Sequence, residues 1–558
     1  MVSTSRNLVL AAAALCLTSS GVNAAAIEAR RTASSSDVPQ HFQTSPELFA
    51  GPTETGQAPF LAETNAAPFP SVSYIPPQPL ETQVPIAGNK HNGNVFQHMG
   101  ELSHYFPSPD GFGVDEFALP PATNISALHM LHRHGARYPT SGTGAEKLGK
   151  RIADASGKFE ATGKLAFLEG WEYKLGKEIL VPIGKQELFD SGTQHYYQYG
   201  HLFPNNGSKI IARSTTQDRM TQSAEYFLTG FFGLGWTQNA TLELIIEEDG
   251  YNNSLAGYHM CNNSNAGVNQ GGLNATKQWA EIYLVNATER IKKQISGLDW
   301  ELKDTYDAQS LCAYETVALG FSHFCSLFTY EEWLGYEYSV DLFFAGSNGF
   351  QAPTGRAVGI GYVQEILARL NHHVIDRPEA QINVTLDNNT LTFPLDQTIN
   401  LDFSHDTNIM SILTAFGLTQ FAPLMPADRY TPNRSLVVSH LEPFAARLDI
   451  EILQAPHPVQ AKRPAVHADA EEYYDTSKGP MKYIHFVLNQ RTVPLGASLE
   501  ECGARDDGWC ELETFLKVQQ NSLDRSQYEW ACFGDYPAVG YGNVTDGAPV
   551  AEELEDEL

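Results

Sequence analysis

The chain has 558 residues, of which 42% are hydrophobic and 18% charged, a composition typical of a globular protein rather than a disordered one. Its formal net charge of −29 would repel nucleic acids and anionic membrane surfaces, so we expect no nucleic-acid partner. A chain this acidic that binds an anion needs a local cluster of cations, or must work at low pH, where its carboxylates lose charge.

The N-terminus is typical of a secretory signal peptide over residues 1–24. Arg6 precedes an apolar run at residues 8–17, and small residues follow up to the expected cleavage site near Ala24. The pair Arg30-Arg31 is a candidate site for removal of a pro-peptide. No later apolar run reaches the roughly 20 residues that cross a bilayer, so we expect no membrane span.

Residues 25–120 are expected to form an N-terminal extension that is partly irregular. Ser, Thr, Pro and Ala dominate its first part, up to residue 85, and favour extended chain. In its second part, at residues 86–120, frequent Gly and Pro predict few regular elements.

Strands and helices alternate in the rest of the chain, which predicts an α/β fold with an open sheet sandwiched by helices. Apolar runs predict strands at 124–131, 208–215, 398–406 and 481–489, and helical spacing predicts helices at 216–233, 354–370 and 407–418. We expect an α/β catalytic domain at 121–234 and 351–545, an inserted, mainly helical subdomain at 235–350 and an acidic tail at 546–558. Because polar motifs follow the strands, we expect the ligand to bind outside their carboxyl ends.

The cysteines predict three disulfides. Cys16 leaves with the signal peptide, and the six that remain allow 15 pairings. Short loops favour two pairs and leave a third: Cys312–Cys325, Cys502–Cys510 and Cys261–Cys532. The Cys and His spacing matches no metal-binding motif, so we expect neither a metal nor a cofactor.

Eleven N-x-S/T sequons follow the predicted signal peptide, and together they predict a glycoprotein that is secreted, extracellular or held in the cell wall. The sequon asparagines are Asn124, Asn206, Asn239, Asn252, Asn262, Asn274, Asn286, Asn383, Asn388, Asn433 and Asn543.

The segment LHRHGARYPT, at residues 131–140, places candidate catalytic and anion-binding side chains at the end of the first predicted strand. Gly135 allows a sharp turn and a close approach to a ligand, and Pro139 ends strand pairing. Arg133 and Arg137 keep their protons, so His134 between them is the group that stays neutral. A neutral imidazole among guanidinium forks predicts a nucleophile directed at a phosphate whose oxygens the arginines bind.

The sequence resembles the histidine acid phosphatase family, including its fungal phytases, over residues 90–545. The resemblance rests on RHGARYP (133–139), on SHDTNI (404–409) and on residues 208–233, where Arg219 takes the place of a third arginine and Arg213 is the second choice. It implies a phosphoglycerate mutase-like fold, and the family's usual disulfide order agrees with the three pairs above. The cysteine pair that tethers the nucleophile segment in many fungal phytases is absent from this sequence.

The resemblance also implies a metal-free reaction in two steps, acting on small phosphomonoesters and plausibly on phytate. His134 forms a phosphohistidine, and Asp406 protonates the leaving alcohol and then activates water. Arg133, Arg137, Arg219 and His405 would hold the phosphate, although His405 could instead orient Asp406. A neutral His134 and a protonated Asp406 predict a bell-shaped pH profile with an acidic optimum.

Several alternatives remain open at this point. The enzyme could be a specific 3-phytase, a mutase-like phosphoryl transferase or an inactive wall glycoprotein, and it could form a homo-oligomer. Lys147 and Lys150 are candidate substrate-binding residues, with a solvated lysine face as the alternative. Residues 144–151 miss the hydroxyl residue of a nucleotide-binding loop, and no G-x-S-x-G motif occurs. His132 is expected to be structural, and His195 and His201 are expected to lie in the core of a helix or just behind the site. His372 and His373 are not expected to form a metal pair, because adjacent helix positions do not face one ligand.

Overall fold

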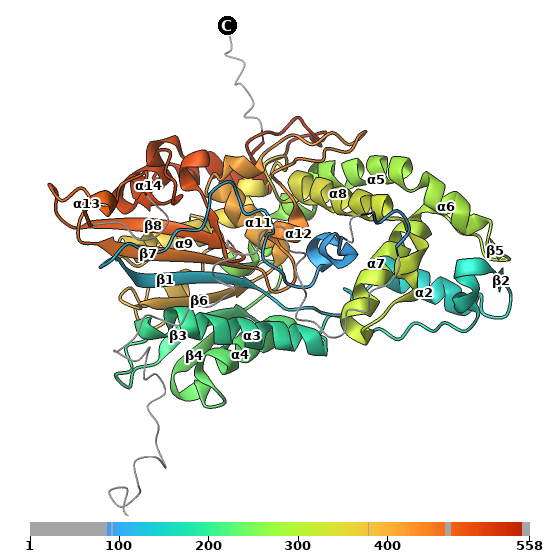
Figure 1. Cartoon of the computed structure of the whole chain (residues 1–558), viewed down its shortest axis with the longest axis horizontal. Helices are drawn as coiled ribbons and strands as arrows, with labels where there is room; N and C mark the ends of the chain where they lie inside the picture. Colours follow the sequence, from blue (N-terminus) through green and yellow to red (C-terminus); the bar gives the residue numbers. More distant parts are fainter. Residues whose placement is uncertain (1–85, 91–92, 378, 464–469, 550–558) are drawn as a thin grey trace, which may run out of the picture. The chain divides into compact units, whose positions relative to one another are not determined.

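The computed structural model describes residues 86–90, 93–377, 379–463 and 470–549 (Figure 1). The predicted signal peptide, the pair Arg30-Arg31, residues 25–85 and the tail from residue 550 lie outside the described residues. Among the described residues, no helix is long and apolar enough to cross a membrane.

An eight-stranded sheet lies at the centre of the described structure, in the order β10-β8-β7-β1-β6-β3-β4, with β9 paired to β8. Strands β1, β6, β3 and β4 are mutually parallel, whereas β7, β8, β9 and β10 add antiparallel pairs on the other side of β1. The bounds are β1 Asn124–Arg133, β3 Ile210–Thr215, β4 Ala240–Ile245, β6 Ile399–Ser404, β7 Arg447–Ala455, β8 Met481–Leu488, β9 Arg491–Val493 and β10 Cys510–Glu511.

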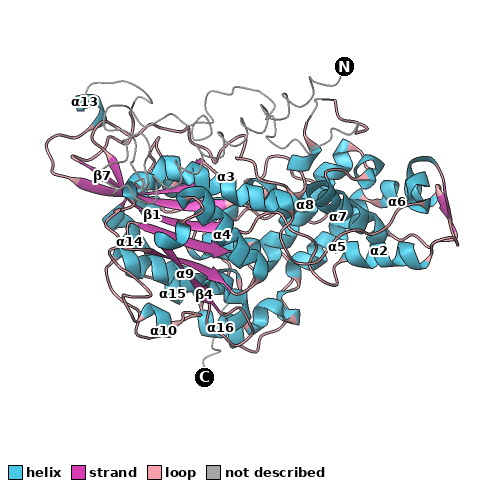
Figure 2. Ribbon diagram, turned by 90° about the horizontal axis from the view of Figure 1, so that it is seen from below, coloured by secondary structure: helices cyan, strands magenta, loops and turns pink. Residues whose placement is uncertain are grey.

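Helices cover both faces of this sheet (Figures 1 and 2). Helices α3 (Pro182–Tyr199) and α4 (Asp218–Phe232) pack on each other and connect β1 to β3 and β3 to β4. Helix α9 (Gly355–Leu370) precedes β6, and α11 (Asp406–Ala415) follows it and packs against α9. From β1 to β3 and from β3 to β4 the chain moves toward the β4 edge of the sheet, whereas from β4 to β6 it moves back toward β1. Right-handed crossovers therefore place α3 and α4 on one face and α9 on the other.

A group of helices extends from one end of the sheet: α2 (Gly144–Asp154), α5 (Gly271–Tyr283), α6 (Val285–Lys292), α7 (Leu302–Leu319) and α8 (Tyr330–Ser347) (Figure 1). Here α2 packs on α7, and strand β2 (Glu160–Ala161) pairs with β5 (Ile295–Ser296). The boundaries expected for the helical insert therefore need correction. Strand β4 falls inside 235–350 but pairs with β3 in the main sheet, whereas α2 and β2 precede that range and pack with the insert.

The remaining elements are short. They comprise η1 (Val95–Gln97) and η2 (Gly100–Leu102) before the sheet, and α10 Val384–Asp387, α12 Val438–Leu441, α13 Ala470–Tyr473, α14 Leu512–Gln519, α15 Ser522–Ser526 and α16 Tyr528–Phe533 after α9. The two single-turn helices between residues 93 and 120 agree with the few regular elements expected there.

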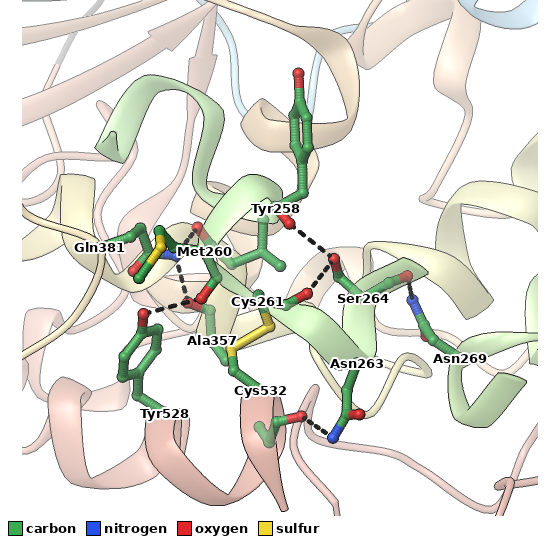
Figure 3. Close-up of a disulfide and its surroundings, with 12 residues drawn as sticks. Tyr258, Met260, Cys261, Asn263, Ser264, Asn269, Ala357, Gln381, Tyr528 and Cys532 are labelled. Carbon is green, nitrogen blue, oxygen red and sulfur yellow. Dashed lines mark hydrogen bonds between the residues drawn. A yellow bond between two sulfur atoms is a disulfide. The ribbon is translucent and has the colours of Figure 1, made fainter. Parts of the chain in front are cut away.

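Three disulfides join the pairs expected from the sequence: Cys261–Cys532, Cys312–Cys325 and Cys502–Cys510. The first ties η6 (Ser254–Met260) to α16, across 271 residues of chain (Figure 3). Hydrogen bonds reinforce this junction: the Tyr528 hydroxyl donates to the Met260 carbonyl at 3.1 Å, and the Asn263 amide donates to the Gly534 carbonyl at 2.8 Å. The segment that follows β4 is thus fixed to the C-terminal helix.

Candidate active site

The four parallel strands end at one edge of the sheet, and the residues that follow them form the candidate active site. Arg133 at the end of β1 lies in register with Ser404 at the end of β6, so His134 and Asp406 start from neighbouring positions. Strand β3, which pairs with β6, leads into α4, whose second residue is Arg219. Motifs from three distant parts of the sequence thus meet outside the carboxyl ends of the strands, as expected for an open α/β sheet.

Arg133 is fixed from three sides. Its side chain is fully buried, and Nη1 donates to the backbone carbonyls of Glu101 at 2.5 Å and Glu442 at 2.6 Å. Nη2 forms an ion pair with Asp406, and the guanidinium lies 4.7 Å from the centre of the Phe444 ring. These contacts hold the guanidinium in a single orientation beside Asp406.

Two acidic side chains that the sequence did not single out lie around Arg133. Burial, followed by the charge of Asp406, raises the pKa of Glu101 to about 7. The same two causes raise the pKa of Glu442, whose carboxyl oxygens are buried without a hydrogen-bond partner among the described residues. Both acids are therefore neutral in acidic medium.

His134 has the protonation state and orientation of a nucleophile. Its Nδ1 lies 2.9 Å from the Gly135 carbonyl oxygen. A carbonyl only accepts hydrogen bonds, so Nδ1 carries the proton and Nε2 the lone pair. Burial, and then the charges of Arg133, Arg137 and Arg219, lower the pKa of His134 well below its ordinary value. This agrees with the neutral imidazole expected from the sequence.

Gly135 is also required by packing against α3. A Cβ at this position would lie 2.2 Å from the Gly184 carbonyl oxygen and 2.6 Å from a Leu188 methyl group. The glycine therefore allows the turn after β1 to approach α3 closely. Next to it, the Ala136 amide donates to Glu187 at 2.7 Å, so α3 fixes the turn that carries the nucleophile.

Arg137 and Arg219 complete the cationic set around His134. Arg137 Nη1 donates to the Tyr138 carbonyl at 3.0 Å, and its side chain also bonds to the Tyr314 phenol on α7. Arg219 Nη1 donates to Glu178 at 3.0 Å. Burial and the neighbouring charge of Arg137 lower the pKa of Arg219 from its ordinary value. An anion bound between these cations would relieve this repulsion.

Arg213, the second choice for the third arginine, lies elsewhere. It is buried within β3 and donates to Asp402 at 2.7 Å and to Glu365 at 2.6 Å. Arg369 donates to the same Asp402 at 2.9 Å. Arg213 therefore balances buried carboxylates inside the fold, and Arg219 is the arginine that the structure places beside His134.

Asp406 is the first residue of α11, and its side chain is 13% exposed. Burial alone would raise its pKa, but the charges of Arg133 and Arg137 and a hydrogen bond from the Thr407 amide lower it below its ordinary value. A bound phosphate would act in the opposite direction, because its negative charge disfavours the carboxylate. The surrounding protein by itself favours the carboxylate.

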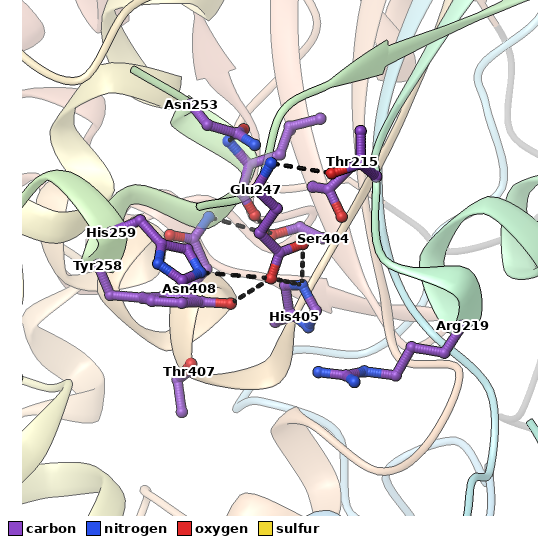
Figure 4. Close-up of polar contacts among 12 residues, drawn as sticks. Thr215, Arg219, Glu247, Asn253, Tyr258, His259, Ser404, His405, Thr407 and Asn408 are labelled. Atoms are coloured by element: carbon purple, nitrogen blue, oxygen red, sulfur yellow. Dashed lines mark hydrogen bonds and ion pairs between the residues drawn. The ribbon is translucent and has the colours of Figure 1, made fainter. Parts of the chain in front are cut away.

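A second network lies behind His405, and its central residue, Glu247, was not recognised in the sequence (Figure 4). His405 Nε2 lies 3.0 Å from the Glu247 carboxylate, and the Tyr258 hydroxyl donates to it at 2.9 Å. His259 Nε2 lies 3.6 Å from the same carboxylate, and its Nδ1 lies 2.6 Å from Asp249. The only sequence signal for Glu247 was its place just after the apolar run that forms β4.

The other candidates are not brought to this cluster. Lys147 and Lys150 are exposed on α2, and His372 and His373 are exposed after α9. His132 and His195 are buried structural histidines, as expected, with bonds to Ser191 at 2.8 Å and to Asp449 at 3.0 Å respectively. His201 is exposed, which corrects the expected core position, because it follows the end of α3. Within the described residues, no group of three or more His, Cys, Asp or Glu could hold a metal ion.

Ten of the eleven sequon asparagines are exposed or partly exposed. Asn239 is buried at 8% exposure, and its amide nitrogen, the atom that would carry a glycan, is covered. This conformation leaves no room for a glycan at Asn239.

Residues 124–489 match the sequence model of the Histidine phosphatase superfamily (branch 2), a range that contains every residue of the cluster around His134 except Glu101. The chain belongs to this superfamily. The histidine phosphatase is 30% identical to Phytase A of Aspergillus oryzae over 447 residues, which cover 75% of this chain and 86% of the relative. It is 31% identical to Phytase A of Arthroderma benhamiae over 436 residues, which cover 75% and 88%.

The fold of this histidine phosphatase is also found in a solved structure, the crystal structure of the phytase from D. castellii. The two share a TM-score of 0.63 at 24% sequence identity, over 80% of this chain and 89% of the other. The resemblance seen in the sequence is confirmed, and membership in the family makes the chain a phosphoric monoester hydrolase.

Proposed function

We propose that this histidine phosphatase is a secreted acid phosphatase that hydrolyses small phosphomonoesters through a phosphohistidine, with phytate among its substrates. The observation that carries the proposal is the neutral, buried His134 next to Arg133, Arg137 and Arg219, with Asp406 ion-paired at its side. Three cations around one uncharged imidazole suit a phosphoryl group, whose oxygens they neutralise while the imidazole attacks phosphorus.

In the first step, the lone pair on His134 Nε2 forms a bond to phosphorus. The bond from phosphorus to the alcohol oxygen breaks, and Asp406 gives that oxygen its proton. The arginines hold the phosphoryl oxygens throughout, and His405 donates to one of them. The negative charge of the bound phosphate, together with its pull on Arg133, raises the pKa of Asp406 and supplies the acid form that this step needs.

In the second step, Asp406 accepts a proton from water as the water oxygen attacks phosphorus. The bond between nitrogen and phosphorus breaks, inorganic phosphate leaves, and His134 recovers its lone pair. Asp406 has regained the proton that it lost in the first step, so the cycle closes without a metal or cofactor.

Acidic medium supports this reaction for a physical reason. Below the pKa of about 7 of Glu101, that carboxyl is neutral and does not compete with phosphate for Arg133. The chain's formal charge of −29 also decreases as carboxylates are protonated, which weakens repulsion of a highly charged substrate such as phytate. We therefore expect a bell-shaped profile with an acidic optimum.

The names of the relatives support phytate as a substrate. Three disulfides support folding in an oxidising compartment, and the ten exposed or partly exposed sequons suit a glycosylated protein outside the cell. A loss of apparent mass after enzymatic deglycosylation of the secreted protein would test this part of the proposal.

Phosphate release from p-nitrophenyl phosphate and from phytate, with the unchanged protein and His134→Ala, tests the proposal directly. We expect turnover of both substrates by the unchanged protein and none above background by the variant. Similar rates on the two substrates would indicate a broad phosphatase, and a strong preference for phytate with first loss of the phosphate at position 3 would indicate a specific 3-phytase. Transfer to an added alcohol instead of water would indicate a phosphoryl transferase, and no turnover would indicate an inactive glycoprotein.

A further inference from the structure

Glu247 follows β4 at the same edge of the sheet as the candidate active site, yet its side chain bonds to histidines and a tyrosine among the described residues and not to the arginines there. Its side chain is fully buried and receives a hydrogen bond from Tyr258, and its backbone amide donates to Thr216 at 3.0 Å. Such a carboxylate, taken out of water, persists only if its charge is balanced nearby.

His405 provides that balance. Burial would raise the pKa of Glu247, but the charge of His405 and hydrogen bonds from His259 and His405 lower it well below its ordinary value. Glu247 is therefore a carboxylate even in acidic medium. The other charged or titratable groups that face this network are Arg219, Tyr258 and His259, with Asp249 beyond His259 and Asp406 beside His405.

The geometry fixes which nitrogen of His405 faces which partner. A carboxylate only accepts, so the proton between Glu247 and His405 Nε2 is donated by the imidazole. No hydrogen bond engages His405 Nδ1 among the described residues. The His405 ring lies 5.7 Å from the ring of His134, so the imidazole sits beside the nucleophile.

We propose that Glu247 is the positioning residue for His405: its carboxylate holds the imidazole through Nε2–H, so that Nδ1–H donates to the phosphate attacked by His134. The inference rests on the proposed function, because it assigns His405 to the phosphate rather than to the orientation of Asp406. It also assigns a role to the disulfide Cys261–Cys532, which fixes η6 to α16. Tyr258 and His259 lie on η6 within three residues of Cys261, so the disulfide helps to hold them beside Glu247 (Figures 3 and 4).

The test compares Glu247→Gln, which removes the charge but keeps the shape, with Glu248→Gln as a matched control. Glu248 is the next residue in the chain, and it is exposed. The readouts are kcat and KM for p-nitrophenyl phosphate between pH 4 and 8, and the inhibition constant of inorganic phosphate. Far-ultraviolet circular dichroism and thermal unfolding check that each variant is folded.

We expect Glu247→Gln to raise both KM and the phosphate inhibition constant about 10- to 100-fold, the usual value of one charge-assisted hydrogen bond. Glu247→Asp, which keeps the charge on a shorter side chain, should recover part of the loss, and Glu248→Gln should change neither constant more than about twofold.

An unchanged inhibition constant, or the same loss in Glu248→Gln, would overturn the assignment. If Glu247→Gln does not fold, nitrogen-15 spectra of the unchanged protein decide, with the His405 signals identified by their absence in His405→Asn. Protons on both ring nitrogens at pH 5 support the proposal, and an unprotonated Nε2 overturns it. An unchanged protein without phosphatase activity would instead refute the proposed function.

Discussion

Replacing Asp406 with asparagine separates its two proposed functions, charge partner of Arg133 and proton donor. The variant leaves the buried guanidinium with the carbonyls of Glu101 and Glu442 but without an anion. Removing one member of a fully buried ion pair costs about 3–5 kcal/mol. Here Asp406 is 13% exposed and two acceptors remain, so we expect a loss of about 2 kcal/mol in the free energy of unfolding.

The effect on the reaction should be larger, and it should depend on the leaving group. General acid catalysis contributes about 10²–10⁴-fold when the departing oxygen needs a proton. Without that proton, an inositol oxygen of phytate would have to leave as a strongly basic alkoxide, whereas p-nitrophenolate is stable as it leaves. We therefore expect Asp406→Asn to lower kcat/KM by about 10³-fold on phytate, and by much less for phosphorylation by p-nitrophenyl phosphate.

The assay measures kcat/KM for both substrates, together with urea unfolding of both proteins. Because kcat/KM reports the first irreversible step, it isolates protonation of the leaving group from the later attack of water. Equal losses on the two substrates would contradict the acid role and leave only a role in holding Arg133. Activity that falls in proportion to the unfolded fraction would assign the effect to stability alone.

Three further perturbations have expected outcomes. Burial raises the pKa of Glu187 to about 7, so the stability that its protonated form contributes is present below pH 4.5 and is lost as the pH rises through 7. In urea unfolding, Glu187→Gln should therefore reduce the fall in the free energy of unfolding between pH 4.5 and 7 by about 3 kcal/mol. An unchanged dependence of that free energy on pH would contradict this prediction. Replacing Cys261 and Cys532 with alanine, which opens a loop of 271 residues, should cost about 5 kcal/mol in the same assay, against about 3 kcal/mol for the disulfide that closes 13 residues; equal costs would argue against chain entropy as the cause. Arg219→Ala should leave a folded protein whose KM for phosphomonoesters rises about 10-fold or more, whereas Arg213→Ala should unfold; the reverse result in activity and circular dichroism measurements would exchange their roles.

The sequence predicts three of the four parallel strands, because apolar runs end in polar motifs at β1, β3 and β6, whereas β4 fell within the expected helical insert. It does not predict β7, although this strand lies next to β1. The β7 sequence, RLDIEILQA, alternates apolar and acidic residues, which suggests a half-exposed strand. Its acids are buried, because Asp449 bonds to His195 at 3.0 Å and Glu451 bonds to Tyr199 at 2.7 Å. Hydrogen-bond partners on α3 offset the cost of burying these acids, and sequence periodicity cannot show those partners.

The residues of the candidate site also divide into those that the sequence predicts and those that it does not. His134 and Arg137 were predictable because their roles follow from spacing within one short motif. Glu101, Glu247 and Glu442 were not, because each is isolated in the sequence and gains its role from a contact across 30 to 310 residues: 32 from Arg133 to Glu101, 158 from His405 to Glu247 and 309 from Arg133 to Glu442. Burial then shifts their pKa values, and burial is a property of the folded chain.

The central claim is that His134 accepts the phosphoryl group. The most direct measurement is to mix the enzyme with p-nitrophenyl phosphate, stop the reaction with alkali within milliseconds, and locate phosphate on peptides by mass spectrometry. We predict one phosphate per enzyme on the peptide containing His134, stable to alkali and lost in acid, with more of it in Asp406→Asn because water is activated more slowly. Phosphate on another residue, or steady turnover without a covalent intermediate in either protein, would contradict the account.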